Sequence, residues 1–542
     1  GGTIQVGNGG AGTLTFNAPV NTTGDVVFNS AGATTASQAI TAGNLTFNSG
    51  TTTTGNINVK NLTVNGAAAT TLNGTLQASS GLLFSSTGTS TVNGVISGAA
   101  SVTQAGSGTV TLVANNTYTG TTTVNAGSTL QVGNNTPTGT LGSGAVTNNG
   151  NLIFNNSGAV NLNNNISGSG NLNKTGGGQL YVYGNLTYTG TTTINGTWMT
   201  FQAGSSLSGT SQVIDNSGIQ FNWNTPATFA VNISGGGQVW QSGSGNLTLT
   251  GNNTYTGTTT TNGGTWLIAG SAMAFGSGAL NDGGGVNLNG FNVAVANLQG
   301  GGQVLNNGAN ATLTLNGASG GGAVFSGVIK DGTGTVSVVK SGNTNQQFTG
   351  NNTYSGGTTI NSGGQIELAG GGQIGTGNVT DNGNLNFYNT NNPLTLVNNI
   401  SGTGSLSVNA VNGKVILAGN NSYTGTTTVQ SGVLDFATEN SLYGGNTAAW
   451  TAANIKVAAN ATLEVRPGSG ALGTGFTDTD IATLVGNLNA ANGGFANGSY
   501  FGIDTANGNY TLSQALTNTA QGTLGLVADG GKTLTVTGAN TY

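Results

Sequence analysis

The chain contains no cysteine and no histidine, and only 4% of its residues are charged. The absence of cysteine excludes a disulfide framework and a thiolate site. The absence of histidine removes the side chain that most often changes its charge near neutral pH. Eight lysine and arginine residues, spread along the sequence, cannot form the basic footprint of a nucleic-acid-binding protein, so we exclude nucleic acid as a partner.

Long apolar segments and clear helix signals are also missing. No run approaches the ~20 residues of a membrane span, so we expect no transmembrane segment. The sequence opens Gly1-Gly2-Thr3, without Met or a signal peptide, which indicates a processed chain or an excerpt. Only the stretch Thr479–Leu484 suggests a short helix. The chain nevertheless keeps short alternating runs of Val, Leu, Ile and Phe, which a disordered chain has no reason to keep.

Glycine, asparagine and threonine are abundant, with 100 glycines in 542 residues. The stretch Asn252–Thr260 reads Asn-Asn-Thr-Tyr-Thr-Gly-Thr-Thr-Thr, and versions of it recur along the chain. Three of the gaps between its tyrosines are about 70 residues, which indicates one structural unit that is repeated. The tyrosines of the motif are Tyr118, Tyr188, Tyr255, Tyr354, Tyr423 and Tyr542.

The repeated unit has the pattern of short strands joined by corners. The Asn, Gly and Thr residues of the motif tolerate positive φ or form local turns, and the β-branched Thr run that follows suits a strand. Strands such as Leu45–Asn48 and Leu62–Asn65 end in Asn, which can stack into a hydrogen-bonded ladder on successive coils. These features predict an all-β fold: a parallel β-solenoid with coils of ~23 residues, forming a single elongated rod.

Changes in this pattern divide the chain into four segments. Residues 1–92 predict N-terminal coils of the solenoid, and residues 93–435 contain the repeats of about 70 residues. Residues 436–530 are richer in Ala and hold close charges such as Glu464, Arg466 and Asp504, which predicts solenoid with longer side loops. Residues 531–542 begin a further repeat.

The repeated unit resembles the passenger-associated transport repeat of autotransporter passenger domains, also called the autotransporter-associated β-strand repeat. The resemblance rests on Ile166–Gly170, Leu247–Thr260 and Thr129–Gly133 with their counterparts, and it covers residues 93–435 and 523–542. The copy at Tyr188 departs from the pattern, because Leu186 stands where the other copies have Asn. The resemblance implies a right-handed parallel β-helix exported to the outer surface of a Gram-negative-type bacterium.

Three glycine-rich stretches match fragments of enzyme motifs but lack the required context. Gly317–Gly321 has the nucleophile-elbow pattern, but the chain has no His to act as the base. Gly370–Gly375 fits a dinucleotide fingerprint without a following helix. Gly531–Thr533 ends like a phosphate loop, with a strand where a helix is needed. We therefore predict no catalytic residue, no cofactor and no enzymatic activity.

Asp478 and Asp480 form the only tight carboxylate pair of the sequence. Such pairs can serve glycoside hydrolysis or bind calcium, but on one short loop a solvated or capping role fits better. We therefore predict no metal site. The cationic cleft of polysaccharide lyases needs clustered basic residues, and the chain offers only Lys330 and Lys340 close together.

The aromatic residues give the one candidate binding site. Trp198 and Trp266 occupy a slot that other repeats fill with Leu or Ile, so we expect both in the core. The alternating residues Ile219, Phe221 and Trp223 are expected to share the inner face. Trp240 follows Val239, and its counterparts in other repeats are polar, so Trp240 is expected to point outward. An exposed Trp can stack on a sugar or a partner, although a lone surface aromatic without a function is the alternative.

These features favour an exported, cell-surface or extracellular β-solenoid that forms a spine, fibre or filament with an adhesive role. The alternatives are a glycan-binding passenger module centred on Trp240 and a polysaccharide-acting enzyme built on a β-helix. Neither end has a capping pattern, so we expect end-to-end self-association or a longer array, with cell surfaces or glycans as other partners. Because the chain has no His and its carboxylates look isolated, we expect stability to change little between about pH 5 and 9.

Overall fold

The computed structural model describes residues 2–10, 12–30, 32–48, 50–318, 322–389, 393–489 and 493–542. The chain forms two compact units, Gly1–Thr260 and Thr261–Tyr542, which we call unit 1 and unit 2. Residues 319–321 of the nucleophile-elbow pattern lie outside the described residues. The four segments that the sequence suggested stay a prediction.

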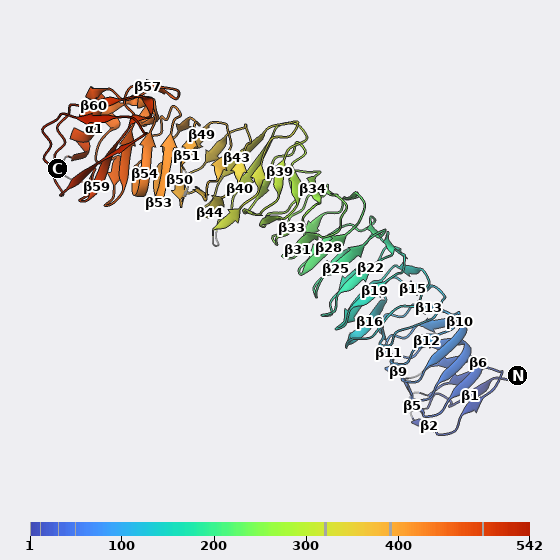
Figure 1. The fold of residues 1–542 in the computed structure, drawn as a ribbon. Helices are drawn as coiled ribbons and strands as arrows, with labels where there is room; N and C mark the ends of the chain where they lie inside the picture. The colour runs from blue at the N-terminus through green and yellow to red at the C-terminus, as the bar shows by residue number, and fades with distance from the viewer. Residues whose placement is uncertain are drawn as a thin grey trace. The chain divides into compact units, whose positions relative to one another are not determined.

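Each unit is a parallel β-solenoid, which confirms the predicted fold class. A coil of unit 1 contains three short strands that lie on three faces, as in β17 (Val146–Asn148), β18 (Asn151–Asn156) and β19 (Val160–Leu162). Each strand pairs in parallel with its counterpart one coil later: β20 (Ile166–Ser167), β21 (Asn171–Lys174) and β22 (Leu180–Val182). Most strands of unit 1 therefore stack along the chain in three sheets, and β29 (Ala227–Phe229) and β32 (Leu247–Leu249) pair in a fourth (Figure 1).

Apart from β29 and β32, the strands of unit 1 belong to a first, a second and a third sheet, named in the order in which one coil visits them. Besides β17 and β20, the first sheet follows the order β1 (Ile4–Val6), β4 (Val26–Phe28), β6 (Ile40–Phe47), β8 (Ile57–Val64), β10 (Leu76–Phe84), β13 (Ser101–Gln104), β15 (Thr122–Val124), then β23 (Asn185–Leu186) and β26 (Ser206–Leu207). Besides β18 and β21, the second contains β2 (Leu14–Phe16), β5 (Thr34–Ala36), β7 (Thr51–Thr53), β9 (Thr70–Leu72), β11 (Ser90–Val92), β14 (Thr109–Leu112), β16 (Thr129–Thr136), β24 (Thr192–Ile194), β27 (Val213–Asp215) and β30 (Ile233–Ser234). Besides β19 and β22, the third contains β25 (Met199–Gln202), β28 (Gly218–Asn222), β31 (Gln238–Gln241) and β33 (Thr259–Thr261).

Among the described residues, unit 2 has one long sheet, two shorter ones and three two-stranded pairs, two of which are β45 (Asn351–Asn352) with β48 (Gln373–Ile374) and β60 (Tyr510–Leu512) with β62 (Leu534–Val536). Its long sheet follows the order β35 (Leu280–Asp282), β38 (Leu298–Gly300), β41 (Ala323–Phe325), β44 (Asn345–Phe348), β47 (Gln365–Ala369), β50 (Asn384–Tyr388), β51 (Leu394–Leu396), β53 (Ser405–Leu417), β54 (Thr427–Phe436), β55 (Ile455–Val457), β56 (Thr462–Val465), β59 (Ser499–Asp504) and β61 (Leu524–Asp529). The shorter sheets contain β34 (Trp266–Ala269), β36 (Gly285–Asn287), β39 (Gln303–Leu305) and β42 (Val328–Ile329), and β37 (Val293–Val295), β40 (Ala311–Leu315), β43 (Val336–Lys340), β46 (Thr358–Ile360), β49 (Val379–Asp381) and β52 (Ile400–Ser401).

The core of each unit is the inside of the coils. Along β18 the buried side chains Leu152 and Phe154 alternate with the partly exposed Ile153, as the two-residue period of a strand requires. The parallel register places Leu152 beside Leu172 of the next coil, so apolar residues form continuous inner stacks. Burial of these stacks supplies the main stabilising free energy of the fold.

The coils are shorter than the sequence suggested. Residues one coil apart, such as Ile96 and Asn116 or Ile233 and Asn253, are separated by 20 positions rather than ~23. Longer coils occur where a loop is added, as between Asn115 and Gly139, which are separated by 24 positions. Most coils are short because strands of two to four residues alternate with tight glycine and asparagine turns.

A coil of this length moves each motif to another face. A repeat of about 70 residues is three coils plus the step to the next strand, so the motif cannot return to the same sheet. In unit 1 the strands after the motif tyrosines are β15 in the first sheet, β24 in the second and β33 in the third. In unit 2 they are β46 and β54, which belong to different sheets. The motif therefore forms a corner that can lie at different edges of the solenoid.

All five complete motifs have the same corner geometry. The tyrosine is buried, with at most 1% of its surface exposed, and its hydroxyl hydrogen-bonds the hydroxyl of the threonine four residues later. The O···O distances are 2.7 Å for Tyr118–Thr122, 2.5 Å for Tyr188–Thr192, 2.6 Å for Tyr255–Thr259, 2.6 Å for Tyr354–Thr358 and 2.6 Å for Tyr423–Thr427. The spacing of Tyr and Thr is the same in all five motifs, and it gives each buried tyrosine hydroxyl a hydrogen-bond partner.

The asparagine before the tyrosine explains why one copy departs from the others. In four copies its Oδ1 accepts the backbone N–H of an isoleucine one coil earlier; the pairs are Asn116 with Ile96, Asn253 with Ile233, Asn352 with Ile329, and Asn421 with Ile400. In the fifth copy Leu186 is buried and pairs with Ile166 as a regular strand neighbour. In this copy the strand pairing of Leu186 with Ile166 replaces the hydrogen bond to an asparagine side chain, so a leucine is tolerated.

Replacing Tyr354 with phenylalanine should destabilise the chain by about 1 kcal/mol, because Thr358 then loses a buried hydrogen-bond partner. Replacing it with alanine should cost about 3–5 kcal/mol, because a cavity is added. Tyr388→Phe is the matched control, since Tyr388 is 41% exposed in the same unit. Chemical denaturation would measure these changes, and equal effects of the two phenylalanine variants would contradict the corner's role.

The C-terminal part of unit 2 adds helices and a hairpin to the coils. Its α-helix α1 (Asp478–Asn489) is the only one among the described residues and is longer than the expected Thr479–Leu484. It buries Ile481, Leu484, Val485 and Leu488. The other additions are η1 (Glu439–Ser441), η2 (Tyr443–Gly445), η3 (Thr447–Ala449), η4 (Thr505–Asn507) and the antiparallel pair β57 (Ser469–Gly470) and β58 (Gly473–Thr474).

Candidate functional site

Trp240 lies on the outer side of β31, as the sequence predicted. It is partly exposed, whereas its neighbours Val239 and Gln241 are buried. Its ring contacts that of Trp198, with ring centroids 5.9 Å apart and planes at 65°. Trp240 is therefore part of an aromatic pair rather than a lone surface residue. Its role in ligand binding stays a prediction.

Trp198 and Trp266 are not core residues, which corrects the sequence interpretation. Both are partly exposed, and the residues that follow them, Met199 and Leu267, are the buried ones. A shift of one residue along a strand moves a side chain to the opposite face. The other aromatic prediction is confirmed, because Ile219, Phe221 and Trp223 are all buried. Phe221 and Trp223 are in contact, with ring centroids 5.0 Å apart.

Glycines of the next coil make room for the two outward indoles. A Cβ added to Gly218 would lie within 2.6–2.7 Å of three carbons of the Trp198 ring. A Cβ added to Gly285 would likewise lie 2.6 Å from Cε3 of Trp266. Each indole thus lies flat over a glycine, with one ring side on the sheet and the other directed outward. Trp198 spans Gly218 in this way and reaches Trp240 two coils on.

A polar network surrounds the aromatic pair on the third sheet of unit 1. Thr200 donates a hydrogen bond to Oε1 of Gln220 at 2.9 Å and accepts one from Nε2 of Gln179 at 2.7 Å. Tyr181 donates to Gln179 at 2.9 Å, and Gln220 donates to Ser242 at 2.9 Å. We call Gln179, Tyr181, Trp198, Thr200, Gln220 and Trp240 the aromatic face.

The aromatic face is fixed in place by these contacts. Thr200 points away from the core, yet only 1% of its surface is exposed, because the surrounding side chains cover it. The amide groups of Gln179 and Gln220 are held by partners on neighbouring coils. An ordered surface of this kind loses little conformational entropy when it binds a ligand.

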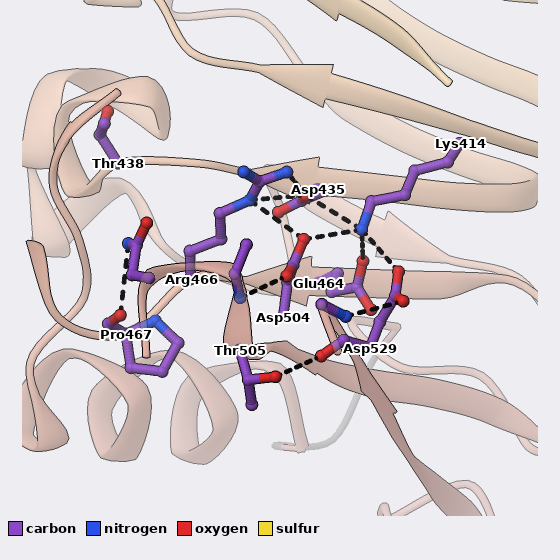
Figure 2. A network of polar contacts seen from close by, with 12 residues as sticks. Lys414, Asp435, Thr438, Glu464, Arg466, Pro467, Asp504, Thr505 and Asp529 are labelled. Atoms are coloured by element: carbon purple, nitrogen blue, oxygen red, sulfur yellow. Dashed lines mark hydrogen bonds and ion pairs between the residues drawn. The ribbon is translucent and has the colours of Figure 1, made fainter. Parts of the chain in front are cut away.

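A second cluster of functional side chains, all charged, lies in the C-terminal part of unit 2 (Figure 2). Nζ of Lys414 lies 3.2 Å from Asp435, 2.6 Å from Glu464, 2.8 Å from Asp504 and 2.8 Å from Asp529. Four strands of the long sheet, β54, β56, β59 and β61, supply these carboxylates, and β53 supplies the lysine. Lys414 therefore joins five strands.

Arg466 completes this charged cluster. Its guanidinium donates to Oδ2 of Asp435 from Nε at 2.9 Å and from Nη2 at 2.6 Å, and it also pairs with Asp504 at 3.1 Å. The cluster thus holds four carboxylates and two cations. Donor oxygens of Asp435, Glu464 and Asp504 lie within 4.8 Å of one another, as in a metal site, but the Lys414 ammonium contacts all three.

Burial, together with the neighbouring charges, changes the pKa values of the cluster. Burial raises the pKa of Asp435 to about 6 and that of Glu464 to about 7, despite the nearby cations. Burial alone would lower the pKa of Lys414, but the surrounding carboxylates raise it above its ordinary value. A groove of about 520 Å³ borders the cluster and is lined by Val411, Lys414 and Asp529, among others. Sequence reasoning noticed Glu464, Arg466 and Asp504 but missed Lys414, Asp435 and Asp529.

Of the predicted carboxylate pair on α1, Asp480 has the capping role. Oδ2 of Asp480 accepts hydrogen bonds from the backbone N–H of Thr477 at 2.8 Å and from its hydroxyl at 2.6 Å. The Thr477 hydroxyl accepts the Asp480 N–H at 3.2 Å in return, which completes a reciprocal cap of the helix N-terminus. Asp478 instead accepts the Tyr510 hydroxyl at 2.5 Å. Lys330 and Lys340 are not a cationic cleft either, because Lys340 is buried.

Three further carboxyl groups are buried at equivalent corners. Burial raises the pKa of Asp215 and of Asp282 to about 7, and that of Asp381 to about 6. In each, Oδ1 accepts the backbone N–H two residues later, at 3.1, 3.1 and 2.9 Å respectively. Among the described residues, Oδ2 of Asp215 and of Asp282 has no hydrogen-bond partner. These groups are therefore most stable when they carry a proton.

Stability of the chain should fall as pH rises from about 4 to 7, which revises the expectation of a pH-independent fold. A carboxyl whose folded pKa is raised stabilises the fold below its unfolded pKa, and this contribution is lost as pH passes the folded value. Asp215, Asp282, Asp381, Asp435 and Glu464 all have raised values. Melting temperatures recorded between pH 4.5 and 8 would test this, and a constant value would contradict it.

Comparison with known proteins supports the class that the fold defines, a repeat-built β-solenoid. Segments 102–132, 172–196, 241–265, 338–365 and 412–436 match the passenger-associated-transport-repeat, and each contains one of the five tyrosine corners. The chain therefore carries five of these repeats, as is consistent with an autotransporter passenger domain with repeats. No curated protein and no solved structure matches the chain. Among the described residues, no helix is long and apolar enough to cross a membrane.

Proposed function

We propose that the chain is an exported passenger that stands on the outer surface of a Gram-negative bacterium as a structural spine and contributes to adhesion. The observation that carries this proposal is the incorporation of five passenger-associated transport repeats into the β-solenoid coils of the two units. The repeats supply corners rather than a reaction centre, since each buries its tyrosine and threonine. Such a fold is suited to presenting outer side chains at a regular spacing.

Surface display can be tested on intact cells of the source organism. An antibody against the purified chain should label unpermeabilised cells, and externally added protease should remove the signal. Cells that lack the gene provide the background, and a periplasmic protein provides the control for membrane integrity. Labelling that requires permeabilised cells would contradict the proposal.

The adhesive role needs a separate measurement. Cells that lack the gene should attach less to a polysaccharide-coated surface than cells with the gene restored, at equal growth and equal display of other surface proteins. Equal attachment would leave a spine without an adhesive role. Imaging the purified chain at rising concentration would test end-to-end association, for which single particles at every concentration are the contradicting result.

A further inference from the structure

The aromatic face has the shape of a stacking surface for a ring. One side of the Trp198 indole covers Gly218, so its other side is directed away from the sheet. The Trp240 ring meets it at an angle of 65°, with ring centroids 5.9 Å apart. Tyr183, 46% exposed, directly follows β22 on the same side as Tyr181. Tyr183, Trp198 and Trp240 thus lie on one face of the third sheet, beside or within β22, β25 and β31, with the β28 coil between the two tryptophans.

The chemistry of the aromatic face selects an uncharged ligand. Its outward side chains on β22, β25, β28 and β31 include amides, hydroxyls and aromatic rings, and no Asp, Glu, Lys or Arg occurs in these four strands. A charged ligand would find no partner of opposite sign there. Amides and hydroxyls can donate and accept hydrogen bonds at once, which matches the hydroxyl groups of a sugar.

Next to the aromatic pair lies a second amide pair that can contact such a ligand. Nδ2 of Asn222 donates to Oε1 of Gln202 at 2.8 Å, two positions along β28 and β25 from Gln220 and Thr200. Both amide side chains are partly exposed, so they keep hydrogen-bonding capacity toward solvent. The apolar rings and these amides therefore lie side by side on one ordered surface.

We propose that the aromatic face of unit 1 binds a neutral oligosaccharide chain, with Trp198 and Trp240 stacking on its sugar rings. Gln202 and Asn222 hydrogen-bond its hydroxyl groups. This inference rests on the proposed adhesive function and names its ligand class. The four strands span about 14 Å at ~4.8 Å per coil, which leaves room for a short run of sugar rings.

The purified chain can be titrated with neutral hexasaccharides of β-linked glucose, N-acetylglucosamine and xylose, by calorimetry and tryptophan fluorescence. At least one should bind, and Trp240→Ala and Trp198→Ala should each weaken it about tenfold or more. Affinity should be the same at low and high salt, because no charge takes part. No binding of any of the three sugars would overturn the proposal.

Trp266→Ala is the matched control, because Trp266 also lies flat over a glycine but stands outside the aromatic face. It should leave affinity unchanged, whereas an equal loss would show that indole removal acts through stability. Trp240→Phe should restore part of the affinity, and binding by Trp240→Ala as strong as that of the unaltered chain would contradict the proposed stacking. These measurements need no cells, so sugar binding can fail while surface display holds, or the reverse.

Discussion

Replacing Asp282 with asparagine is expected to stabilise the chain by about 2–4 kcal/mol at pH 8 and to change its stability little at pH 4. At pH 8 the buried carboxyl is ionised, with a pKa of about 7 in the fold against 3.8 in its ordinary state. Its Oδ2 has no hydrogen-bond partner among the described residues. Asparagine has the same shape, carries no charge and can donate a hydrogen bond from that position.

The chain itself contains the neutral version of this corner. Asn148 occupies the equivalent place, since its carbonyl accepts the N–H of Gly170 as that of Asp282 accepts the N–H of Gly302. Its Oδ1 accepts the Gly150 N–H at 3.2 Å, and its Nδ2 donates to the carbonyl of Asn171 at 2.8 Å. The amide therefore both accepts and donates a hydrogen bond at this corner, whereas a carboxylate can only accept.

The reciprocal substitution is the matched control. Asn148→Asp should destabilise the chain at pH 8 by a similar amount, and the loss should shrink as pH approaches 4, because the new carboxyl becomes protonated. Asp215→Asn should repeat the gain in unit 1, where burial has raised the pKa in the same way. Denaturant titrations at both pH values would measure the differences. A pH-independent effect of Asp282→Asn would show that the buried charge is not the cause.

The same logic applies to buried lysines of the repeats. Gln104 and Gln241 each donate from Nε2 to the carbonyl two residues later, and Lys174 and Lys340 place Nζ on the equivalent carbonyls, those of Gly176 and Gly342. Burial lowers the pKa of Lys174 to about 8. Amide and ammonium thus alternate at one corner, and the amide fulfils the role without the cost of a buried charge.

The sequence predicted the solenoid well because its evidence is local. Alternating runs, turn residues and the recurring Tyr–Thr spacing define strands and corners within a few residues. The coil length was overestimated, because a period of about 70 residues does not reveal that the motif moves by one face in each repeat. Trp198 was placed in the core because the strand's register differs by one residue from that of the other repeats, and Met199 takes the inner position.

The charged cluster could not be predicted because its contacts are remote in sequence. Lys414 lies 90 positions from Asp504 and 115 from Asp529. Asp435 lies between the core residues Leu434 and Phe436, so alternation places it on the outer side of β54. The sequence does not indicate that other side chains bury it there. Only the stacking of β53 to β61 brings these groups together. The local sequence pattern predicts which face of a strand a side chain occupies, whereas the register between coils determines which residues that side chain contacts.

Replacing Lys414 with methionine should destabilise unit 2 by about 3–5 kcal/mol at pH 8, because four carboxylates would then share only Arg466. The loss should be smaller at pH 5, where protonation of Glu464 and Asp435, with pKa values of about 7 and 6, relieves the repulsion. Lys456→Met removes the same charge from an exposed position on β55 and should have little effect.

A second substitution separates lost attraction from a lost side chain. Glu464→Gln added to Lys414→Met should recover part of the stability at pH 8, because it removes one of the uncompensated buried charges. Hydrogen exchange would locate the change: amides of β54, β56 and β59 should exchange faster in Lys414→Met, while those of unit 1 keep their rates. If the double variant is less stable than Lys414→Met alone, or if Lys456→Met costs as much, then the cluster does not hold these strands together through charge.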